Sequence, residues 1–408
     1  MKPASLLRRV KFDSSNVQAL DATFDVLPKA YSSRRTPPTA CEKWRFFNFS
    51  ECLHSNYRLI VLADTQFDLF GEPLAASSIK KSSRADASKR AESAVLPVAA
   101  DEALTRLAAT IPAGVRYGTS SWSFPGWAGS VYGDSYSDVQ LARHGLPAYA
   151  AHPLLRTVGI DRTFYAPISE SAFRGYAKQV REIAPGFRFL VKAPMLFTGP
   201  RLRSDEGRWT DNTAFLNASL ATAQFILPAT QNLMDACGPL VFQFPPLGPK
   251  FTRAPHQFAD ALAEFLVALP KLSGPAFYAV EVRDPELLTD DYLAALCAGG
   301  ATHCIAIHAR MPQASEQARF WRDSGRLPLV MRWSLHSGMK YEEAKERYAP
   351  FNALVDEDPA GRAQIATLAL EATGAQRETF IIANNKAEGS APLTIQKLAQ
   401  LVRNYGAT

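Results

Sequence analysis

From Val115 onward, short runs of β-branched and aromatic residues alternate with longer segments of helical period. This alternation is typical of parallel strands joined by crossover helices. Eight runs are present, and eight strands close a (β/α)8 barrel. The predicted strands are Val115–Thr119, Thr157–Asp161, Phe187–Lys192, Leu240–Phe244, Tyr278–Arg283, Thr302–His308, Leu329–Trp333 and Thr379–Asn384. We therefore predict an α/β protein with a TIM-type barrel over residues 113–408.

Helix start and stop signals lie between these runs. Ser169 is a candidate N-cap before Glu170–Ala184, and Pro185-Gly186 follows as a stop signal. Thr289 precedes Asp290–Cys297 in the same way. These signals fit the crossover helices that a barrel requires.

The chain before the barrel lacks a sustained period. Residues 80–100 are mostly Ser, Ala, Lys and Arg, a composition with too little apolar surface to fold alone, so we predict a flexible linker over 80–112. Residues 1–79 are predicted to form a mostly irregular extension. Two alternatives stay open for residues 1–60: they belong to the natural protein, or they precede a true start at Val61.

Composition sets the broad class. Hydrophobic residues make up 47% and charged residues 21%, as in a globular protein with a sizeable core. No uninterrupted apolar run is long enough for a membrane span, and no apolar segment follows the basic N-terminus as in a secretory signal. The five cysteines are widely spaced without a C-x-x-C pair, which argues against a disulfide framework or a zinc site. We expect a cytoplasmic protein without membrane contact.

The net charge of +6 is unevenly placed. Residues 1–100 hold 15 Lys and Arg against 10 Asp and Glu, whereas the remainder is almost neutral. The basic character therefore belongs to the extension, and it does not indicate a nucleic-acid-binding face on the barrel.

Strand parity predicts a ring of polar side chains inside the barrel. Alternate residues of a barrel strand face the helices and the lumen, and the helix-facing set should be apolar. In Tyr278–Arg283 this rule turns Glu281 and Arg283 inward. Applied to all strands, it brings together Asp161, Lys192, Gln243, Glu281, Arg283, His308, Arg332 and Asn384. These residues lie at the C-terminal strand ends, where barrel active sites are built.

The chemistry of this ring suits an anionic ligand. Lys and Arg can bind carboxylate or phosphate oxygens, and Glu281, His308 and Lys192 are the candidate catalytic groups. The candidate substrate-binding residues are Trp122, Asp161, Tyr165, Gln243, Arg283, Arg332, Asn384 and Asn385. Alternatively, Glu281, Arg283 and Lys192 form a buried ion network, and His308 is an ordinary core residue. Asp161, Glu281 and His308 could ligate a metal, but no ligand spacing requires one, and no cofactor is specified.

Several motifs occur in order along about 290 residues: Gly118–Trp127, Thr163-Phe164-Tyr165, Lys192-Ala193-Pro194 with Thr198, Gln243-Phe244-Pro245-Pro246, Glu281-Val282-Arg283, and Asn384-Asn385 with Gly389 and Ala391. Together they resemble the signature of the YecE-like family, also known as domain of unknown function 72. The resemblance implies a TIM-type barrel whose shared residues cluster at the mouth, and it implies no established activity.

The sequence departs from the family pattern at two places. It has Met331–His336 where many members carry an Arg-Leu-His-Gly stretch. It has Lys386 and Glu388 after the two asparagines, where an acidic residue usually follows directly. These departures indicate a subgroup and leave the roles of Lys386 and Glu388 open.

A short motif in the extension suggests a second activity. Residues 66–70 read Gln-Phe-Asp-Leu-Phe and resemble the pentapeptide by which bacterial replication and repair proteins dock on the sliding clamp. Gln66 and Asp68 would supply polar contacts, and Leu69 and Phe70 would fill an apolar pocket. The alternative is a chance match, or packing of Leu69 and Phe70 on the barrel.

Three functions fit these residues. The first is an enzyme, a hydrolase or lyase, acting on an anionic small molecule or a nucleic-acid-derived substrate at the mouth. The second is a non-catalytic DNA replication or repair accessory protein that docks on the clamp. The third is a sugar-binding barrel walled by aromatic side chains. Against this function, only Asp161 and Glu281 can be assigned as carboxylates at the mouth, and a glycosidase needs two at a separation that the sequence does not give.

Overall fold

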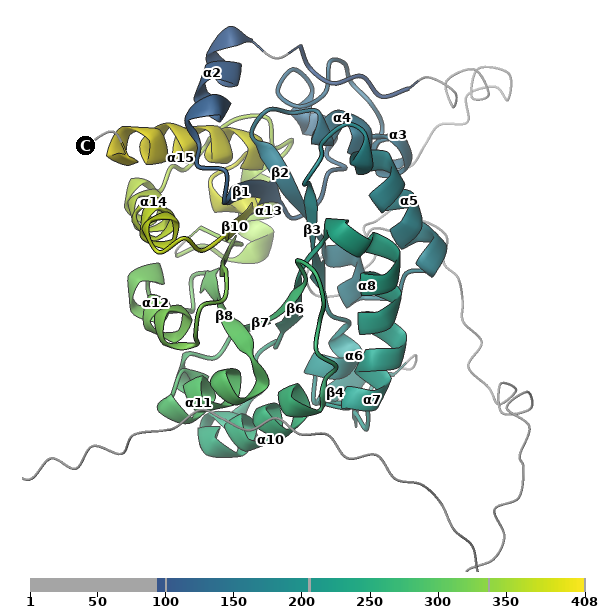
Figure 1. Cartoon of the computed structure of the whole chain (residues 1–408), viewed down its shortest axis with the longest axis vertical. Helices are drawn as coiled ribbons and strands as arrows, with labels where there is room; N and C mark the ends of the chain where they lie inside the picture. Colours follow the sequence, from purple (N-terminus) through teal and green to yellow (C-terminus); the bar gives the residue numbers. More distant parts are fainter. Residues whose placement is uncertain (1–93, 100, 205–206, 337, 407–408) are drawn as a thin grey trace, which may run out of the picture. The chain divides into compact units, whose positions relative to one another are not determined.

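The predicted barrel is confirmed by the computed structural model, which describes residues 94–99, 101–204, 207–336 and 338–406. Eight parallel strands close in the order β1-β10-β9-β8-β7-β6-β3-β2 (Figure 1). Their bounds are β1 Val115–Thr119, β2 Leu155–Ile160, β3 Arg188–Lys192, β6 Cys237–Gln243, β7 Phe277–Glu281, β8 Ala301–Ile307, β9 Leu329–Trp333 and β10 Thr379–Ala383. Each predicted strand overlaps one of them.

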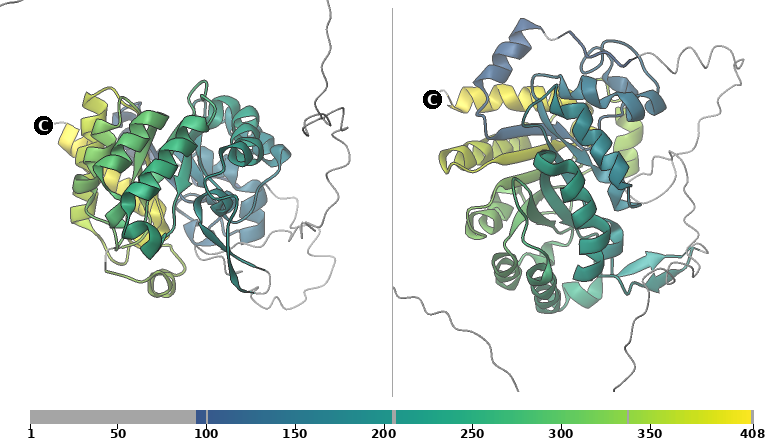
Figure 2. Two further views of the ribbon diagram at one scale, coloured as in Figure 1. Left: turned by 90° about the horizontal axis from the view of Figure 1, so that it is seen from below. Right: turned by 45° about the vertical axis from the view of Figure 1, so that its right-hand side comes forward.

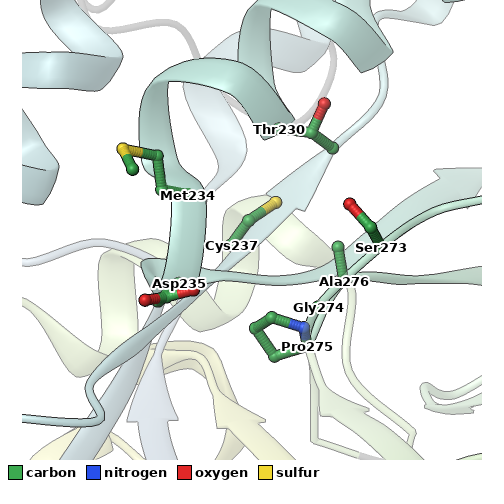
Figure 3. Close-up of a pocket in the computed structure, with 8 residues that line it drawn as sticks. All are labelled: Thr230, Met234, Asp235, Cys237, Ser273, Gly274, Pro275 and Ala276. Carbon is green, nitrogen blue, oxygen red and sulfur yellow. The ribbon is translucent and has the colours of Figure 1, made fainter.

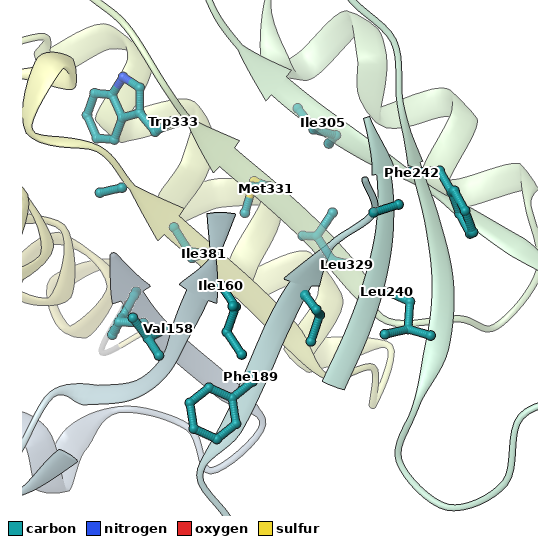
Figure 4. Packing of buried hydrophobic residues seen from close by; sticks show 14 of the residues in the cluster. Val158, Ile160, Phe189, Leu240, Phe242, Ile305, Leu329, Met331, Trp333 and Ile381 are labelled. Atoms are coloured by element: carbon teal, nitrogen blue, oxygen red, sulfur yellow. The ribbon is translucent and has the colours of Figure 1, made fainter. Parts of the chain in front are cut away.

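The strands have two apolar faces. The outward face packs against the helices through residues such as Phe189, Phe242 and Met331 (Figure 4). The inward face forms a separate cluster inside the barrel, made of Leu190, Val241, Phe277, Ala279, Cys304, Val330, Phe380 and Ile382. Because side chains alternate along a strand, the inward residues that follow this cluster emerge together at the C-terminal end.

Helices surround the strands on the outside (Figures 1 and 2). They are α2 Glu102–Thr110, α3 Asp138–His144, α4 Leu146–Ala150, α5 Glu170–Arg181, α6 Met195–Thr198, α7 Ala218–Ala221, α8 Leu227–Leu233, α9 Pro249–Thr252, α10 Pro255–Ala268, α11 Asp290–Gly299, α12 Ala314–Asp323, α13 Tyr341–Tyr348, α14 Pro359–Gly374 and α15 Ala391–Gly406. A small hairpin of β4 (Arg201–Arg203) and β5 (Trp209–Asp211) projects from the connection after β3 (Figure 2).

The predicted helix signals act as expected. The Ser169 hydroxyl accepts a hydrogen bond from the Ala172 N–H at 3.2 Å, and α5 begins at the next residue. The Thr289 hydroxyl accepts from the Tyr292 N–H at 3.2 Å and caps α11. That helix ends at Gly299, and the next residue, Gly300, has a φ of +62°, a left-handed conformation that glycine adopts without strain.

The linker prediction fails over its last part, because α2 occupies Glu102–Thr110. Asp101 caps this helix, Leu107 is buried, and the helix packs on α15 (Figure 1). The apolar residues at helical spacing were hidden by the Ala-rich composition. The predicted extension, 1–79, and the docking peptide at 66–70 lie outside the described residues. Within the described part of the chain, no helix is both long and apolar enough to cross a membrane.

Candidate functional site

The predicted ring of polar side chains follows the inward apolar cluster, at the C-terminal ends of the strands. Lys192, Gln243, Glu281 and Arg332 each lie two residues after an inward apolar residue of the same strand. All four are buried. The register places Gln243 beside Glu281, so neighbouring strands bring their polar ends together. The inward orientation predicted from parity is confirmed for these four residues.

Arg332 joins three strand ends at the centre of this ring. Its Nη1 donates to Gln243 Oε1 at 2.7 Å and to Glu281 Oε2 at 2.6 Å. Its Nη2 donates to Asp161 Oδ2 at 2.7 Å. A planar guanidinium matches this fan of acceptors, and a lysine could not bond all three with the same geometry. Arg332 therefore fixes the positions of its three partners.

Glu281 is held between two arginines. Arg283 Nη2 lies 2.5 Å from Glu281 Oε1, opposite the contact with Arg332. Burial alone would raise the pKa of Glu281, but the positive charges of Arg283 and Arg332 outweigh it and lower the pKa to about 2. The carboxylate is therefore ionised at neutral pH. The buried ion network considered from the sequence is present for Glu281 and Arg283, but its third member is Arg332 and not Lys192.

Lys192 differs from its neighbours because its charge is not paired by a hydrogen bond. It is fully buried, and within the described part of the chain Nζ has no hydrogen-bond partner. Nζ lies 3.6 Å from the centre of the Phe164 ring, which offers a cation–π contact and no proton acceptor. Burial lowers the pKa of Lys192 to about 7, although the nearby charge of Asp161 opposes the shift.

The formal charges of the ring do not balance. Lys192, Arg283 and Arg332 face two carboxylates, Asp161 and Glu281, so protonated Lys192 leaves an excess of one positive charge. Desolvated excess charge is costly unless a ligand neutralises it. A carboxylate or phosphate oxygen beside Lys192 would supply both the missing charge and the missing acceptor.

His308 lies just beyond the end of β8 and is half-buried. Burial and the positive charge of Arg283 lower the pKa of His308 to about 4. Its Nδ1 accepts from the Arg310 N–H at 3.3 Å. His308 is therefore neutral at pH 7, and a neutral imidazole can take up a proton.

Four other candidate binding residues have different surroundings. Trp122 is buried, and its ring packs edge-on against Tyr176 of α5 at 5.1 Å, among the outward-facing core residues. Tyr165 is half-buried beside Phe164. Asn384 donates to Ser120 Oγ at 3.2 Å and accepts from the Lys386 N–H. Asn385 Oδ1 accepts from Trp127 Nε1 and the Ala391 N–H, so this amide holds the chain after β10 in place.

Ser334 is a mouth residue that the sequence analysis missed. Its hydroxyl accepts from Arg283 Nη2 at 3.3 Å. Ser334 lies two residues after Arg332, so the same parity rule, extended past the strand end, would have found it.

Lys386 and Glu388, the residues of the second family departure, both contact the chain that follows β9. Glu388 is fully buried and accepts from Arg362 Nη2 at 2.5 Å and from the Asp358 N–H at 2.7 Å. Lys386 Nζ lies 4.2 Å from the centre of the Tyr341 ring of α13. Both residues therefore hold the segment between β9 and α14 against the barrel.

Two of the candidate metal ligands, Asp161 and Glu281, are paired with the same arginine. The Arg332 guanidinium binds both Asp161 and Glu281, in the position that a cation between the two carboxylates would take. Within the described ranges, no three His, Cys, Asp or Glu side chains gather as metal ligands do.

A separate hollow of about 260 Å³ lies at the opposite end of the barrel (Figure 3). It is lined by Met234 and Asp235 in the turn before β6, by Cys237 at the start of that strand, and by the segment before β7. Burial raises the pKa of the Cys237 thiol to about 12, so the hollow contains no reactive thiolate there. The polar ring at the mouth therefore remains the candidate site.

The sequence model of a family described as "Protein of unknown function DUF72" matches residues 116–408. The chain belongs to the DUF72 family. A DUF72 family protein from Enterococcus faecalis V583 superimposes with a TM-score of 0.50 at 16% identity, covering 71% of this chain and 95% of that one. A DUF72 family protein from Thermotoga maritima MSB8 is 19% identical, with a TM-score of 0.49 and coverage of 71% and 98%. The likeness to the Enterococcus protein, at 16% identity, concerns the fold alone. No curated protein matches the sequence.

Proposed function

We propose that this DUF72 protein is an enzyme that binds a small anionic substrate at the C-terminal mouth of its barrel. The observation that carries the proposal is Lys192 Nζ, which is fully buried beside an Arg–carboxylate network and lacks a hydrogen-bond acceptor among the described residues. Such a group is costly to keep in a folded protein, and costly groups concentrate at functional sites.

The residues of the ring take separate roles in this proposal. Lys192 carries the reacting proton, since an amine with a pKa near 7 can both lose and regain one at neutral pH. Neutral His308 is the second proton carrier. Glu281 and Arg332 position the ring, because the Glu281 carboxylate stays ionised and Arg332 already binds three partners. Arg283, at the outer side, contacts the substrate anion.

Arg283 is suited to that contact by its location. Its side chain is 10% exposed, whereas the Glu281 side chain is fully buried. An entering carboxylate or phosphate therefore meets Arg283 before it reaches Lys192. The ligand class is either a carboxylate or a phosphate ester, and a reaction of the hydrolase or lyase type fits a pair of proton carriers.

Calorimetric titration of the protein with oxalate and with inorganic phosphate, between pH 6 and pH 9, tests this site. Bound anion favours protonated Lys192, so affinity should fall as the pH rises above about 7. Lys192→Met should abolish this pH dependence. If neither probe binds, or if binding is unchanged in Lys192→Met and across the pH range, the proposal is wrong.

The docking peptide supports a second proposal, that the protein is brought to DNA replication or repair sites by the bacterial sliding clamp. Its support is the sequence Gln66-Phe67-Asp68-Leu69-Phe70, in a segment outside the described residues. Titration of the full chain against the clamp should show binding that is lost in the Leu69→Ala/Phe70→Ala double variant. Equal affinity of the double variant would exclude this peptide as the docking site.

A further inference from the structure

The surroundings of Lys192 indicate which kind of substrate it can engage. Its amine lies at the C-terminal end of β3, and the Phe164 ring covers one side at 3.6 Å. The hydroxyl of Thr163 donates to the Lys192 backbone carbonyl at 2.5 Å, so the start of the side chain is fixed by the neighbouring segment after β2. The amine is therefore held in place at its base and faced by an apolar ring.

Among the described residues, no hydrogen-bond donor competes for the lone pair of this amine. The Arg332 Nη atoms are occupied by Asp161, Gln243 and Glu281, and Arg283 is occupied by Glu281 and Ser334. A neutral amine that makes no hydrogen bond keeps its lone pair available for attack on carbon. The cations around it disfavour the protonated form further.

We propose that Lys192 forms a Schiff base with a small carbonyl compound that bears an anionic group, of the 2-oxo acid or aldehyde acid class. This inference rests on the proposed function, because the same mouth must first bind the anion. The anionic group would contact Arg283, and the carbonyl carbon would lie at Nζ.

The step is balanced without any further reactant. The Nζ lone pair forms a bond to the carbonyl carbon, and the carbonyl π pair moves to oxygen. One proton passes from nitrogen to that oxygen, which gives a carbinolamine. The nitrogen lone pair then forms the second carbon–nitrogen bond as the carbon–oxygen bond breaks, and the departing hydroxyl takes the second nitrogen proton to leave as water. Neutral His308 is the group at the mouth that can take and return these protons.

The burial of the ring limits the size of the substrate. The Asp161 side chain is 19% exposed and that of Arg283 is 10% exposed, whereas Lys192 is fully buried. A ligand must therefore pass Asp161 and Arg283 to reach the amine. Short acids of a few carbon atoms fit this requirement better than polymers do.

The test is reductive trapping of the full protein with glyoxylate, the smallest carbonyl carboxylate, and cyanoborohydride at pH 7, with peptide mass spectrometry as the readout. An ordinary lysine has a pKa of about 10.4, so a lysine with a pKa near 7 holds roughly a thousandfold more free amine at pH 7. Lys192 should therefore be modified at least about tenfold faster than exposed Lys250, even after allowance for restricted access.

Oxalate separates this inference from the proposed function, since it is an anion that forms no Schiff base. Fast modification of Lys192 that oxalate slows supports both proposals. Oxalate binding without preferential modification of Lys192 overturns the Schiff base and leaves the anion site intact. Preferential modification that oxalate does not slow, with no oxalate binding by calorimetry, supports the amine and overturns the anion site. Neither binding nor preferential modification overturns both.

Two variants show whether the labelling of the β3 peptide depends on the Lys192 amine. Lys192→Arg keeps a positive charge without a nucleophilic amine, and it should leave modification of Lys250 unchanged. If Lys192→Arg does not fold, Lys192→Met serves instead, with thermal unfolding measured to show that it is intact. Loss of glyoxylate-dependent modification at the β3 peptide in a folded variant is the expected result. Unchanged labelling of that peptide would show that another group had reacted.

Discussion

The two ends of the barrel lumen both contain arginine–carboxylate clusters, but they differ in burial and in pairing. At the N-terminal end, Arg116 Nη2 lies 3.0 Å from Glu378 Oε1, and Arg188 Nη1 lies 3.6 Å from Glu378 Oε2. The Glu378 side chain is 36% exposed, so its carboxylate is partly accessible to solvent. At the C-terminal mouth, Glu281 is fully buried between Arg283 and Arg332.

The pairing differs as well. At the N-terminal end, Arg116 also donates to the Gly186 carbonyl at 2.6 Å and lies 5.7 Å from the Phe380 ring. At the mouth, Lys192 has no acceptor in the described part of the chain. The cluster of Arg116, Arg188 and Glu378 closes the N-terminal end of the lumen with a small desolvation penalty, because Glu378 is partly exposed. The mouth keeps a buried ring of charges in which the Lys192 amine has no acceptor, an arrangement that is unfavourable for stability and that the proposed anion site would explain.

The largest effect is expected for Glu281→Gln. Removal of the carboxylate leaves two buried arginines with too little counter-charge, so the free energy of unfolding should fall by about 3–5 kcal/mol. Chemical denaturation measures the change. The folded pKa of about 2 lies below the unfolded value of about 4.3, so the stabilising contribution is present above pH 4.3 and is lost as the pH falls toward 2. Glu281→Gln should flatten the acid limb, and a loss below 1 kcal/mol would contradict the assigned role.

Lys192→Met should change stability in the opposite direction. Methionine has a similar shape and avoids the cost of a buried amine, so the free energy of unfolding at pH 7 should rise by about 1–4 kcal/mol. The Lys192 pKa falls from about 10.4 unfolded to about 7 folded, so the unfolded wild-type chain binds more protons between these values. Wild-type stability therefore rises over this range, and the advantage of the variant should shrink.

Lys250→Met, at an exposed position, is the matched control and should change stability by no more than about 0.5 kcal/mol. A destabilised Lys192→Met protein would show that the amine makes a structural contribution, and it would remove the contrast between the two ends of the lumen.

The smallest effect is expected for Glu378→Gln at the N-terminal end. This ion pair is partly exposed, so its removal should cost about 1 kcal/mol or less, and the cost should decrease further in high salt. Thermal unfolding in low and high salt measures both. A cost equal to that of Glu281→Gln would mean that burial does not distinguish the two clusters.

The fold could be predicted because its signals are local and repeated. Each strand has an apolar run, the caps Ser169 and Thr289 lie where helices begin, and parity depends only on neighbours along a strand. The α2 helix was missed because its few apolar positions lie in an Ala-rich segment whose partner, α15, is far away in the sequence. Parity likewise found the inward polar residues but stopped at the strand end, before Ser334.

The sequence by itself determined the eight strands, the direction of their side chains and the set of charged residues that meet at one rim, because a period of two along each strand fixes which face a residue occupies. Only the tertiary structure decided how those charges pair. Arg332 bonds Asp161, Gln243 and Glu281 across the lumen, and Lys192 is left beside Phe164. Pairing depends on distances between strands far apart in the chain, and those distances also set the opposite pKa shifts of Glu281 and Lys192.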